Sequence, residues 1–340
     1  MKFGVLGISF WRSSLIIREE LIRILETIFA DYFEQFSTCI PLFTCNRVEV
    51  YFCSENVDDY LNQLMRIIEE RTQKIMKSSF YYYFDEKCLY HLVKVVSGLD
   101  SPVLGETEIQ GQVKRAYQQV CNQRKLPPLL HLLFQRSLHI GKKLRSRENF
   151  TFIKESFEQL IFDLIKKKFC SDFLSRKVLF VGFSKINKKV FSFFSKKGFL
   201  YLQFYSISQQ NEKIDVKNLN TYFFISQSEL KSIWNYDVII FGSNSKSLIF
   251  KDFHIFTDNF KKERLIFDLG VPRNFNLDYK ERLLDVYNMD NLNSLLLLTH
   301  SFVDNCSSTT LKQCVLIETN KQWELFKNKV CRYRQWAVAS

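Results

Sequence analysis

The chain has 340 residues, of which 46% are hydrophobic, and a formal net charge of +12. This length predicts two or three domains, while the longest apolar runs, such as "NSLLLLTHSF", are too short to cross a bilayer. Nine irregularly spaced cysteines, five scattered histidines and no secretory pattern at the N-terminus argue against a disulfide framework, a zinc site and export, so we expect a cytoplasmic protein with free thiols.

The first elements of the chain predict an α+β unit. Four of them follow one another as strand, helix, strand and helix: residues 1–10, 13–29, 47–53 and 57–74. The helix of 13–29 has Ser13 or Ser14 as its cap, and "RVEVYFC" alternates with the period of a half-buried strand. From residue 85 to 147 the pattern is helical, broken by the polar, glycine-containing "SGLDSPVLGET".

Cys45 stands in "PLFTCNRVEVY", on the loop that enters the strand of residues 47–53. Most cysteines in a reducing compartment are small buried apolar groups. Loops held by a rigid scaffold, however, are where catalytic groups concentrate. On these residues alone Cys45 is either a buried structural thiol or a nucleophile with Arg47 beside it to hold an anionic substrate.

His91 begins "HLVKVVSGLD" on a predicted helix with apolar neighbours. A lone histidine on such a face is more often a satisfied core residue than a catalyst. It would activate Cys45 only if the fold brought the two together, because a nearby imidazole favours the reactive thiolate. Their spacing in the sequence does not decide this.

The positive net charge points to an anionic partner, with a phosphate backbone as the first candidate. Basic residues are densest in "FQRSLHIGKKLRSR", on a predicted helix: Arg136, Lys142, Lys143, Arg145 and Arg147. A basic helix face is more often merely solvated, and lysine is over-used along the whole chain. From charge alone, we rank a nucleic acid partner slightly above a merely solvated helix face or a general excess of lysine.

From residue 176 onward apolar strands alternate with helices, which predicts a parallel sheet covered on both faces. The strands expected after the first, "RKVLFV", are residues 200–208, 222–226, 236–245 and 264–272. A helix is expected over 228–234, and the chain is predicted to be helical after residue 290.

"GFSKIN" at residues 182–187 lies between a predicted strand and a helix, where a dinucleotide-binding fold places GxGxxG. Only Gly182 is present, since Ser184 and Asn187 occupy the other two glycine positions. A domain without cofactor fits the motif equally well. No acid ends the second strand, where Ser206 and Ser208 stand instead, and this favours NADPH over NADH.

Together these segments resemble the glutamyl-tRNA reductase family. "TCNRVEVY" and "HLVKVVSGLDSPVLGETEIQGQVKRAY" carry the most specific similarity, and "SSLIIREEL", "LLFQRSLHIGKKLRSR", "LIFDLGVPRNFN" and "VYNMDNL" extend it over nearly the whole chain. The resemblance implies an α+β catalytic domain that binds glutamyl-tRNA over residues 1–147 and an α/β Rossmann-like NADPH domain over 148–290. Residues 291–340 would be a helical tail, the remnant of a dimerisation domain.

The resemblance also implies the reaction: NADPH-dependent reduction of glutamyl-tRNA to glutamate-1-semialdehyde through a thioester on Cys45, the first step of five-carbon tetrapyrrole synthesis. It implies further that His91 is a catalytic residue required for activity, in place of the core residue expected from its helix face alone. The substrate-binding positions implied are Thr44, Asn46, Arg47, Ser101, Glu106, Thr107, Glu108 and Gln112. The cofactor-binding positions are Gly182, Phe183, Ser184, Lys185, Ile186 and Asn187. Arg47 suits the glutamate carboxylate because a guanidinium binds it bidentately.

The chain departs from the family pattern in two places. Glu106-Thr107-Glu108 stands where the family reads Glu-Pro-Gln, and Glu108 adds negative charge beside a site for an anionic amino acid. The glycine motif is eroded, so we expect side chains at 184 and 187 to crowd the backbone and the affinity for NADPH to be modest, with Lys185, Lys188 and Lys189 helping to hold it by charge. The erosion keeps open a rival function, a tRNA- or partner-binding protein without reductase activity.

The tail is expected to form one amphipathic helix, since apolar residues recur there at helical spacing: Val315, Leu316, Trp323, Phe326 and Val330. Family members usually continue into a further dimerising domain, but this chain stops at Ser340. The helix either folds back or pairs with a second subunit; we expect a homodimer because Trp323 and Phe326 are large. The labile product implies a second partner, glutamate-1-semialdehyde aminotransferase.

Overall fold

The computed structural model describes most of the chain: residues 2–32, 35–36, 38–72, 74–106, 108–146, 156–205, 233–243, 262–275, 283–300 and 312–327. The chain divides into two compact units. The first unit comprises Met1–Lys154 and Leu297–Ser340, and the second comprises Glu155–Leu296. None of the described helices is long and apolar enough to cross a membrane.

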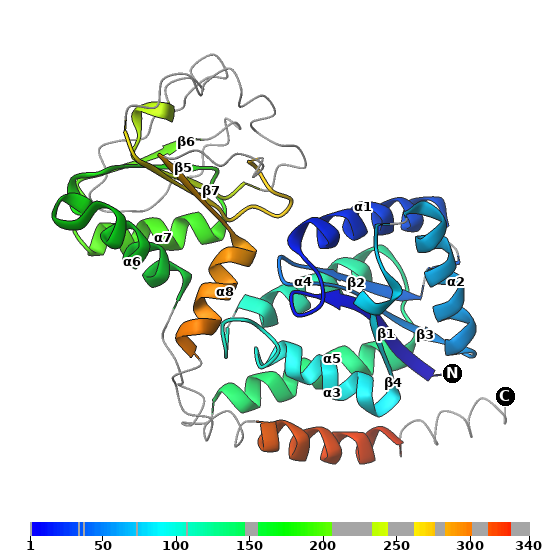
Figure 1. Ribbon diagram of the computed structural model, residues 1–340. Helices are drawn as coiled ribbons and strands as arrows, with labels where there is room; N and C mark the ends of the chain where they lie inside the picture. The colour runs from blue at the N-terminus through cyan, green and yellow to red at the C-terminus, as the bar shows by residue number, and fades with distance from the viewer. Residues whose placement is uncertain are drawn as a thin grey trace, which may run out of the picture. The chain divides into compact units, whose positions relative to one another are not determined.

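The first unit is built on a four-stranded sheet in the order β2-β3-β1-β4 (Figure 1). Its strands are β1 (Lys2–Ser9), β2 (Cys39–Phe43), β3 (Arg47–Ser54) and β4 (Tyr81–Phe84). Every neighbouring pair runs antiparallel. Because side chains alternate along a strand, β3 has an apolar face with Val48, Val50 and Phe52, which join one core cluster. The opposite face of β3 begins with Arg47 and Glu49, and both are buried.

Helices cover both faces of this sheet (Figure 1). They are α1 (Leu15–Asp31), α2 (Val57–Arg71), α3 (Asp85–Val96), α4 (Glu108–Gln123) and α5 (Pro128–Arg145). Helices α1 and α2 pack against the apolar face of β3, and α3, α4 and α5 cover the other. The sequence signals explain the helix starts: the Asn56 side chain accepts from the Asp59 amide to cap α2, and α5 starts at a proline.

The predicted α+β architecture of this unit is confirmed, with two strands that the sequence did not reveal. Strand β2 has five residues and contains Pro41, and β4 has four residues, "YYYF". Both lie at the edges of the sheet, where short strands and proline are tolerated. Their patterns are too short to show a period of two.

The second unit contains a five-stranded sheet in the order β6-β5-β7-β8-β9. Its strands are β5 (Lys177–Val181), β6 (Tyr201–Tyr205), β7 (Val238–Phe241), β8 (Arg264–Asp268) and β9 (Leu284–Asn288), and its helices include α6 (Phe157–Phe169) and α7 (Lys185–Lys196). All neighbouring strands are parallel, which confirms the predicted sheet. Strand β9 and helix α6 were not predicted, and the strand expected at 222–226 lies outside the described residues.

Beyond the second sheet, α8 (Met289–His300) crosses the boundary between the units, and residues 312–327 form the predicted tail helix. The tail helix packs on the first unit, where Val315 and Phe326 are 0% and 3% exposed. The ring of Phe326 lies 5.0 Å from that of Phe3, and the Trp323 ring 6.3 Å from it. The reason we gave for pairing was therefore wrong, because both aromatic residues contact their own chain; the homodimer itself stays a prediction. Leu316 is 48% exposed and is not part of the buried stripe, and Val330 lies outside the described residues.

The tail helix should therefore stabilise the first unit. We expect Phe326→Ala to lower its free energy of unfolding by about 3–5 kcal/mol, because a buried aromatic side chain would leave a cavity beside Phe3. Urea unfolding followed by tryptophan fluorescence measures this, and Trp323, whose ring lies 5.5 Å from that of Phe326, contributes to the signal. Lys321→Ala is the control, since Lys321 is exposed on the same helix and should cost under about 0.5 kcal/mol. Equal effects of the two substitutions would contradict the packing described.

Candidate active site

Cys45 lies on the three-residue connection between β2 and β3, and it is half-buried. The preceding Thr44 shapes this connection. Its hydroxyl oxygen accepts hydrogen bonds from the amides of Asn46 (3.2 Å) and Arg47 (3.1 Å), and its own amide donates to the Arg47 carbonyl at 2.9 Å. A hydroxyl that binds nearby backbone amides in this way fixes a tight turn. The thiol is thus presented at the apex of a rigid loop.

Arg18 of α1 holds the same loop from the other side. Its side chain is fully buried, and its Nε donates to the Cys45 carbonyl at 2.9 Å while Nη1 donates to the Ser13 carbonyl at 2.5 Å. The amide of Phe10 donates to the Asn46 carbonyl at 2.8 Å. In the sequence, Arg18 was noted only as part of "SSLIIREEL", one of the segments that resemble the family. Its contact with Cys45 was not predicted, because the two residues are distant along the chain.

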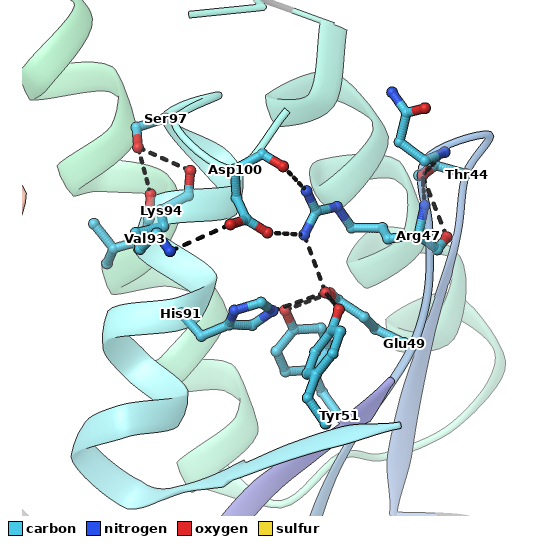
Figure 2. A network of polar contacts seen from close by, with 11 residues as sticks. Thr44, Arg47, Glu49, Tyr51, His91, Val93, Lys94, Ser97 and Asp100 are labelled. Carbon is cyan, nitrogen blue, oxygen red and sulfur yellow. Dashed lines mark hydrogen bonds and ion pairs between the residues drawn. The ribbon is translucent and has the colours of Figure 1, made fainter. Parts of the chain in front are cut away.

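Arg47 is the centre of a buried polar network (Figure 2). It is 1% exposed, and its Nη1 lies 3.1 Å from Glu49 Oε1 and 3.0 Å from Asp100 Oδ2. Its Nη2 donates to the Asp100 carbonyl at 2.7 Å, and Lys94 Nζ lies 3.2 Å from the other carboxylate oxygen of Asp100. The two acids hold the guanidinium in one orientation. Among the described residues, Arg47 Nε has no hydrogen-bond partner.

Glu49 receives hydrogen bonds from three more side chains. Tyr51 donates to Oε2 at 2.7 Å, Tyr81 donates to Oε1 at 2.5 Å, and His91 Nε2 lies 2.7 Å from Oε1. Burial alone would raise the pKa of Glu49, but His91 and Arg47 together with these hydrogen bonds hold the pKa well below its usual range. Burial raises the pKa of Tyr51 and Tyr81, so both hydroxyls remain donors.

His91 is 6% exposed and lies between aromatic rings. Its ring centroid is 5.2 Å from that of Tyr81 and 5.1 Å from that of Tyr83. Because Nε2 contacts Glu49, which in turn contacts Arg47, His91 is linked to Arg47 through one side chain, that of Glu49. The apolar helix face seen in the sequence therefore contains a polar group with a defined partner.

The segment between α3 and α4 supplies further predicted site residues. Asp100 brings this segment to Arg47, and Ser101 beside it is buried. Gly98 closes the segment, because its φ is +75° and a Cβ there would lie 2.7 Å from the Glu106 amide nitrogen. Glu108 and Gln112 lie half-buried on α4, and Thr107 lies outside the described residues. Sequence reasoning missed Glu49, although "RVEVY" puts Arg47 and Glu49 on the same strand face.

Part of the basic segment serves the fold rather than a surface. Arg145 donates from Nη1 to Gln110 Oε1 at 2.7 Å and from Nη2 to the Val96 carbonyl. Lys143 Nζ lies 2.9 Å from a carboxylate oxygen of Glu318, a buried residue of the tail helix. Arg136 is half-buried and Lys142 is exposed, and Arg147 lies outside the described residues. Arg145 and Lys143 of this segment thus have partners within the first unit, and binding of nucleic acid by the segment stays a prediction.

In the second unit, Gly182 ends β5 with a φ of +91°, and a Cβ there would lie 2.8 Å from the Gly242 carbonyl. The Ser184 hydroxyl caps α7 by accepting from the Asn187 amide. Asn187 is fully buried, and its Nδ2 donates to the carbonyls of Val181 (3.1 Å) and Gly182 (2.9 Å). The side chain at 187 thus points into the protein, and the modest cofactor affinity expected from this position stays a prediction.

This turn retains the features that bind a pyrophosphate. It follows a central parallel strand at its carboxyl end, where nucleotides bind in such sheets. The first turn of α7 offers backbone amides at Lys185 and Ile186, and the helix dipole favours an anion there. Phe183 stacks on Phe204 of β6 with ring centroids 4.9 Å apart. Ser206 and Ser208 lie outside the described residues.

Comparison with known proteins matches both units. Residues 6–148 match the family model for the N-terminal domain of glutamyl-tRNAGlu reductase, and residues 163–295 match the model for shikimate/quinate 5-dehydrogenase. The glutamyl-tRNA reductase of Chlamydia caviae is 32% identical over 97% of this chain and 94% of its own, and that of Chlamydia pneumoniae is 32% identical over 100% and 97%. A solved glutamyl-tRNA reductase from Methanopyrus kandleri is 19% identical, with a TM-score of 0.48 over 96% of this chain and 80% of its own.

The network around Arg47 should make the first unit sensitive to acid. The pKa of Asp100, like that of Glu49, is lowered, because Arg47, His91 and Lys94 outweigh the effect of its burial. Their contribution is present above their ordinary pKa values, 3.8 and 4.5, and is lost as the pH falls through the lower values of the folded state. We expect Glu49→Gln to cost about 3–5 kcal/mol at pH 7 and to flatten the decline of stability below pH 4.5.

Urea unfolding at a series of pH values between neutrality and acid measures both effects. Glu70→Gln is the matched control, because Glu70 is 62% exposed and its ion pair with Arg66 lies on the surface. The control should leave the stability and its pH dependence unchanged. If Glu49→Gln and the unmodified chain lose stability in parallel on acidification, the role given to Glu49 is wrong.

Proposed function

The chain belongs to the glutamyl-tRNA reductase family, and from that membership we propose that it reduces the glutamate of glutamyl-tRNA to glutamate-1-semialdehyde and releases the tRNA, with NADPH as the reductant. This reaction is the first step of tetrapyrrole biosynthesis. The observation that carries the proposal for this site is the pairing of a loop-borne thiol at Cys45 with a buried, oriented guanidinium at Arg47.

Arg47 is suited to bind the carboxylate of the substrate. Glu49 and Asp100 occupy its Nη1 and one position of Nη2, and Nε has no partner among the described residues. A buried donor without a partner costs about 1–3 kcal/mol, which a bound carboxylate would recover. The edge of a guanidinium that includes Nε can bind both oxygens of a carboxylate. Thr44 and Asn46 precede Arg47 in the chain and Ser101 follows Asp100, and all three are buried, which supports their assignment to the same site.

Cys45 is the nucleophile in this proposal. Its thiolate attacks the ester carbonyl, so that a carbon–sulfur bond forms while the bond to the terminal ribose oxygen breaks and that oxygen takes a proton. The product on the enzyme is a thioester, and a thiolate suits both steps because it is a good nucleophile and a good leaving group. Arg18 and Thr44 keep the loop in place for the attack. His91 acts as a positioning residue through Glu49 and Arg47.

The nicotinamide cofactor is held at Gly182, Phe183, Ser184, Lys185, Ile186 and Asn187, and when bound it supplies the hydride that turns the thioester into the aldehyde and frees the thiolate. The carboxyl end of β5 and the amides of α7 support this location. NADPH rather than NADH is favoured because no acid follows β6, where the sequence continues with Ser206. The positive charge of the turn after β5 suits the pyrophosphate of either cofactor. Lys185 is exposed at the start of α7, followed by Lys188 and Lys189 in the same turn.

Two partners and a compartment complete the proposal. The reactive aldehyde product supports transfer to glutamate-1-semialdehyde aminotransferase. A homodimer is supported by the outer side of the tail helix, where Leu316, Ile317 and Leu325 are exposed. A cytoplasmic location is supported by the free cysteines among the described residues.

Cys45→Ser tests the nucleophile. We expect it to abolish the labelled glutamyl thioester and the semialdehyde while tRNA binding changes less than about twofold, because an alcohol is a far weaker nucleophile than a thiolate. The first effect is measured by quenching the reaction in acid, which preserves the thioester of radiolabelled glutamate, and then mapping the labelled peptide. Cys170→Ser is the control, since Cys170 is an exposed thiol of the second unit. Label on any cysteine other than Cys45 would rule out the assignment.

The same assay with glutamyl-tRNA and NADPH separates the reductase from the rival function. Semialdehyde among the products supports the reductase. Free glutamate alone, with a functional thiol, would favour a binding protein that has lost its reductase activity.

Asn187→Gly tests the reading of the cofactor turn, because it restores one glycine of the motif. We expect NADPH affinity to stay within about twofold, since the side chain points inward, and the stability of the second unit to fall by about 1–3 kcal/mol as the hydrogen bonds to Val181 and Gly182 are lost. Calorimetric titration and urea unfolding measure these quantities. A tenfold gain in NADPH affinity would show that Asn187 obstructs the cofactor after all.

A further inference from the structure

Trp11 is a large aromatic side chain that the fold leaves 52% exposed on the turn after β1. The antiparallel register places this turn beside Cys45. Ser9 pairs with Arg47, and the amide of the next residue, Phe10, donates to the Asn46 carbonyl at 2.8 Å. Trp11 and Cys45 are the residues that flank this hydrogen-bonded pair, so the turn that carries the indole adjoins the loop that carries the thiol.

The turn that carries Trp11 is firmly held. The amides of Arg12 and Ser13 both donate to the Ser9 carbonyl, at 2.9 and 3.0 Å. The Phe10 ring lies 5.5 Å from the Trp11 ring in an edge-to-face arrangement, and the guanidinium of Arg18 lies 5.9 Å from the Phe10 ring. Since Arg18 also binds the Cys45 carbonyl, it joins the turn that carries Trp11 to the loop that carries Cys45.

Arg12, the residue after Trp11, adds a positive charge to the same turn. It is exposed, and its Nη1 donates to the Phe80 carbonyl at 3.1 Å while its guanidinium lies 5.7 Å from the Tyr81 ring. No carboxylate among the described residues pairs with it. An exposed indole beside an unneutralised cation is the combination that binds a nucleotide, the ring by stacking on the base and the cation by contact with the phosphate.

The reaction brings a nucleotide to this place. The ester that Cys45 attacks joins glutamate to the ribose of the terminal adenosine of tRNA, so the base of that adenosine must lie within one nucleoside of the thiol. We propose that Trp11 stacks on this terminal adenine and that Arg12 contacts its phosphate. The inference rests on the proposed function and identifies where the leaving group binds.

The variants Trp11→Ala and Trp11→Phe test the stacking with two substrates that differ only in the leaving group. Acylation of Cys45 is measured with glutamyl-tRNA and with the ethyl ester of the glutamate α-carboxyl group, which has no nucleoside. Loss of one base stack corresponds to about 5- to 150-fold in affinity. We expect Trp11→Ala to lower kcat/KM for glutamyl-tRNA by that factor, mainly through KM, and Trp11→Phe to retain most of it. The ethyl ester should be used equally well by all three chains.

Arg12→Gln tests the phosphate contact. The slope of the logarithm of tRNA affinity against the logarithm of salt concentration should fall in magnitude by about 0.7, the value for one contact to a single strand. Tyr82→Ala is the matched control for both measurements, because Tyr82 is 57% exposed on β4 and should leave each of them unchanged.

Each outcome decides the proposal. An equal loss with both substrates would show that Trp11 only maintains the Cys45 loop, and unchanged kinetics with glutamyl-tRNA would assign Trp11 to another partner, such as a protein surface; either result overturns the inference. If the unmodified chain acylates Cys45 with neither substrate, the proposed function fails as well, which distinguishes that failure from failure of the stacking alone.

Discussion

The first unit depends on one constraint, the burial of a permanent positive charge at Arg47. Removing a guanidinium from water costs several kcal/mol unless acids and hydrogen bonds compensate. Glu49 provides one acid from the same face of β3, and Asp100 provides the second from the segment between α3 and α4. Each acid needs partners in turn, and these come from β4 and α3. A single charge thereby ties a strand, its neighbours and a helix connection into one arrangement.

Such a network is a poor means of stabilising a fold, because well-packed apolar residues of similar volume often serve as well or better. What it supplies is a guanidinium with a fixed direction. The two acids have further partners of their own, since Lys94 lies beside Asp100 and His91 beside Glu49. This preorganisation explains why the fold retains charged groups in its interior, and it suits the recognition of an amino acid carboxylate.

Helices of several turns, and strands in which apolar and polar residues alternate several times, could be predicted from the sequence. Contacts between distant residues could not. The period of two in "RVEVYFC" indicated β3, and the apolar runs indicated the parallel sheet. Strands β4 and β9 have four and five residues and show too few alternations. Cys45 and Arg47 emerged because the motif is local. The partnership of His91 with Glu49 spans 42 positions, and no spacing rule connects them.

The glycine motif of the second unit failed as a signal for a different physical reason. A glycine at the third position lets a helix approach its strand, and the same approach is achieved here by a buried amide. Asn187 donates to carbonyls at the end of β5, and a Cβ on Gly242 would lie 2.4 Å from its Oδ1. The glycine that allows the close approach is therefore Gly242, directly after β7, and not residue 187. Asp268 secures the next strand end by accepting from the amides of Gly270, Asn274 and Phe275. Because side chains and a displaced glycine hold these strand ends, the count of glycines in the motif does not measure the capacity of the turn to bind a nucleotide.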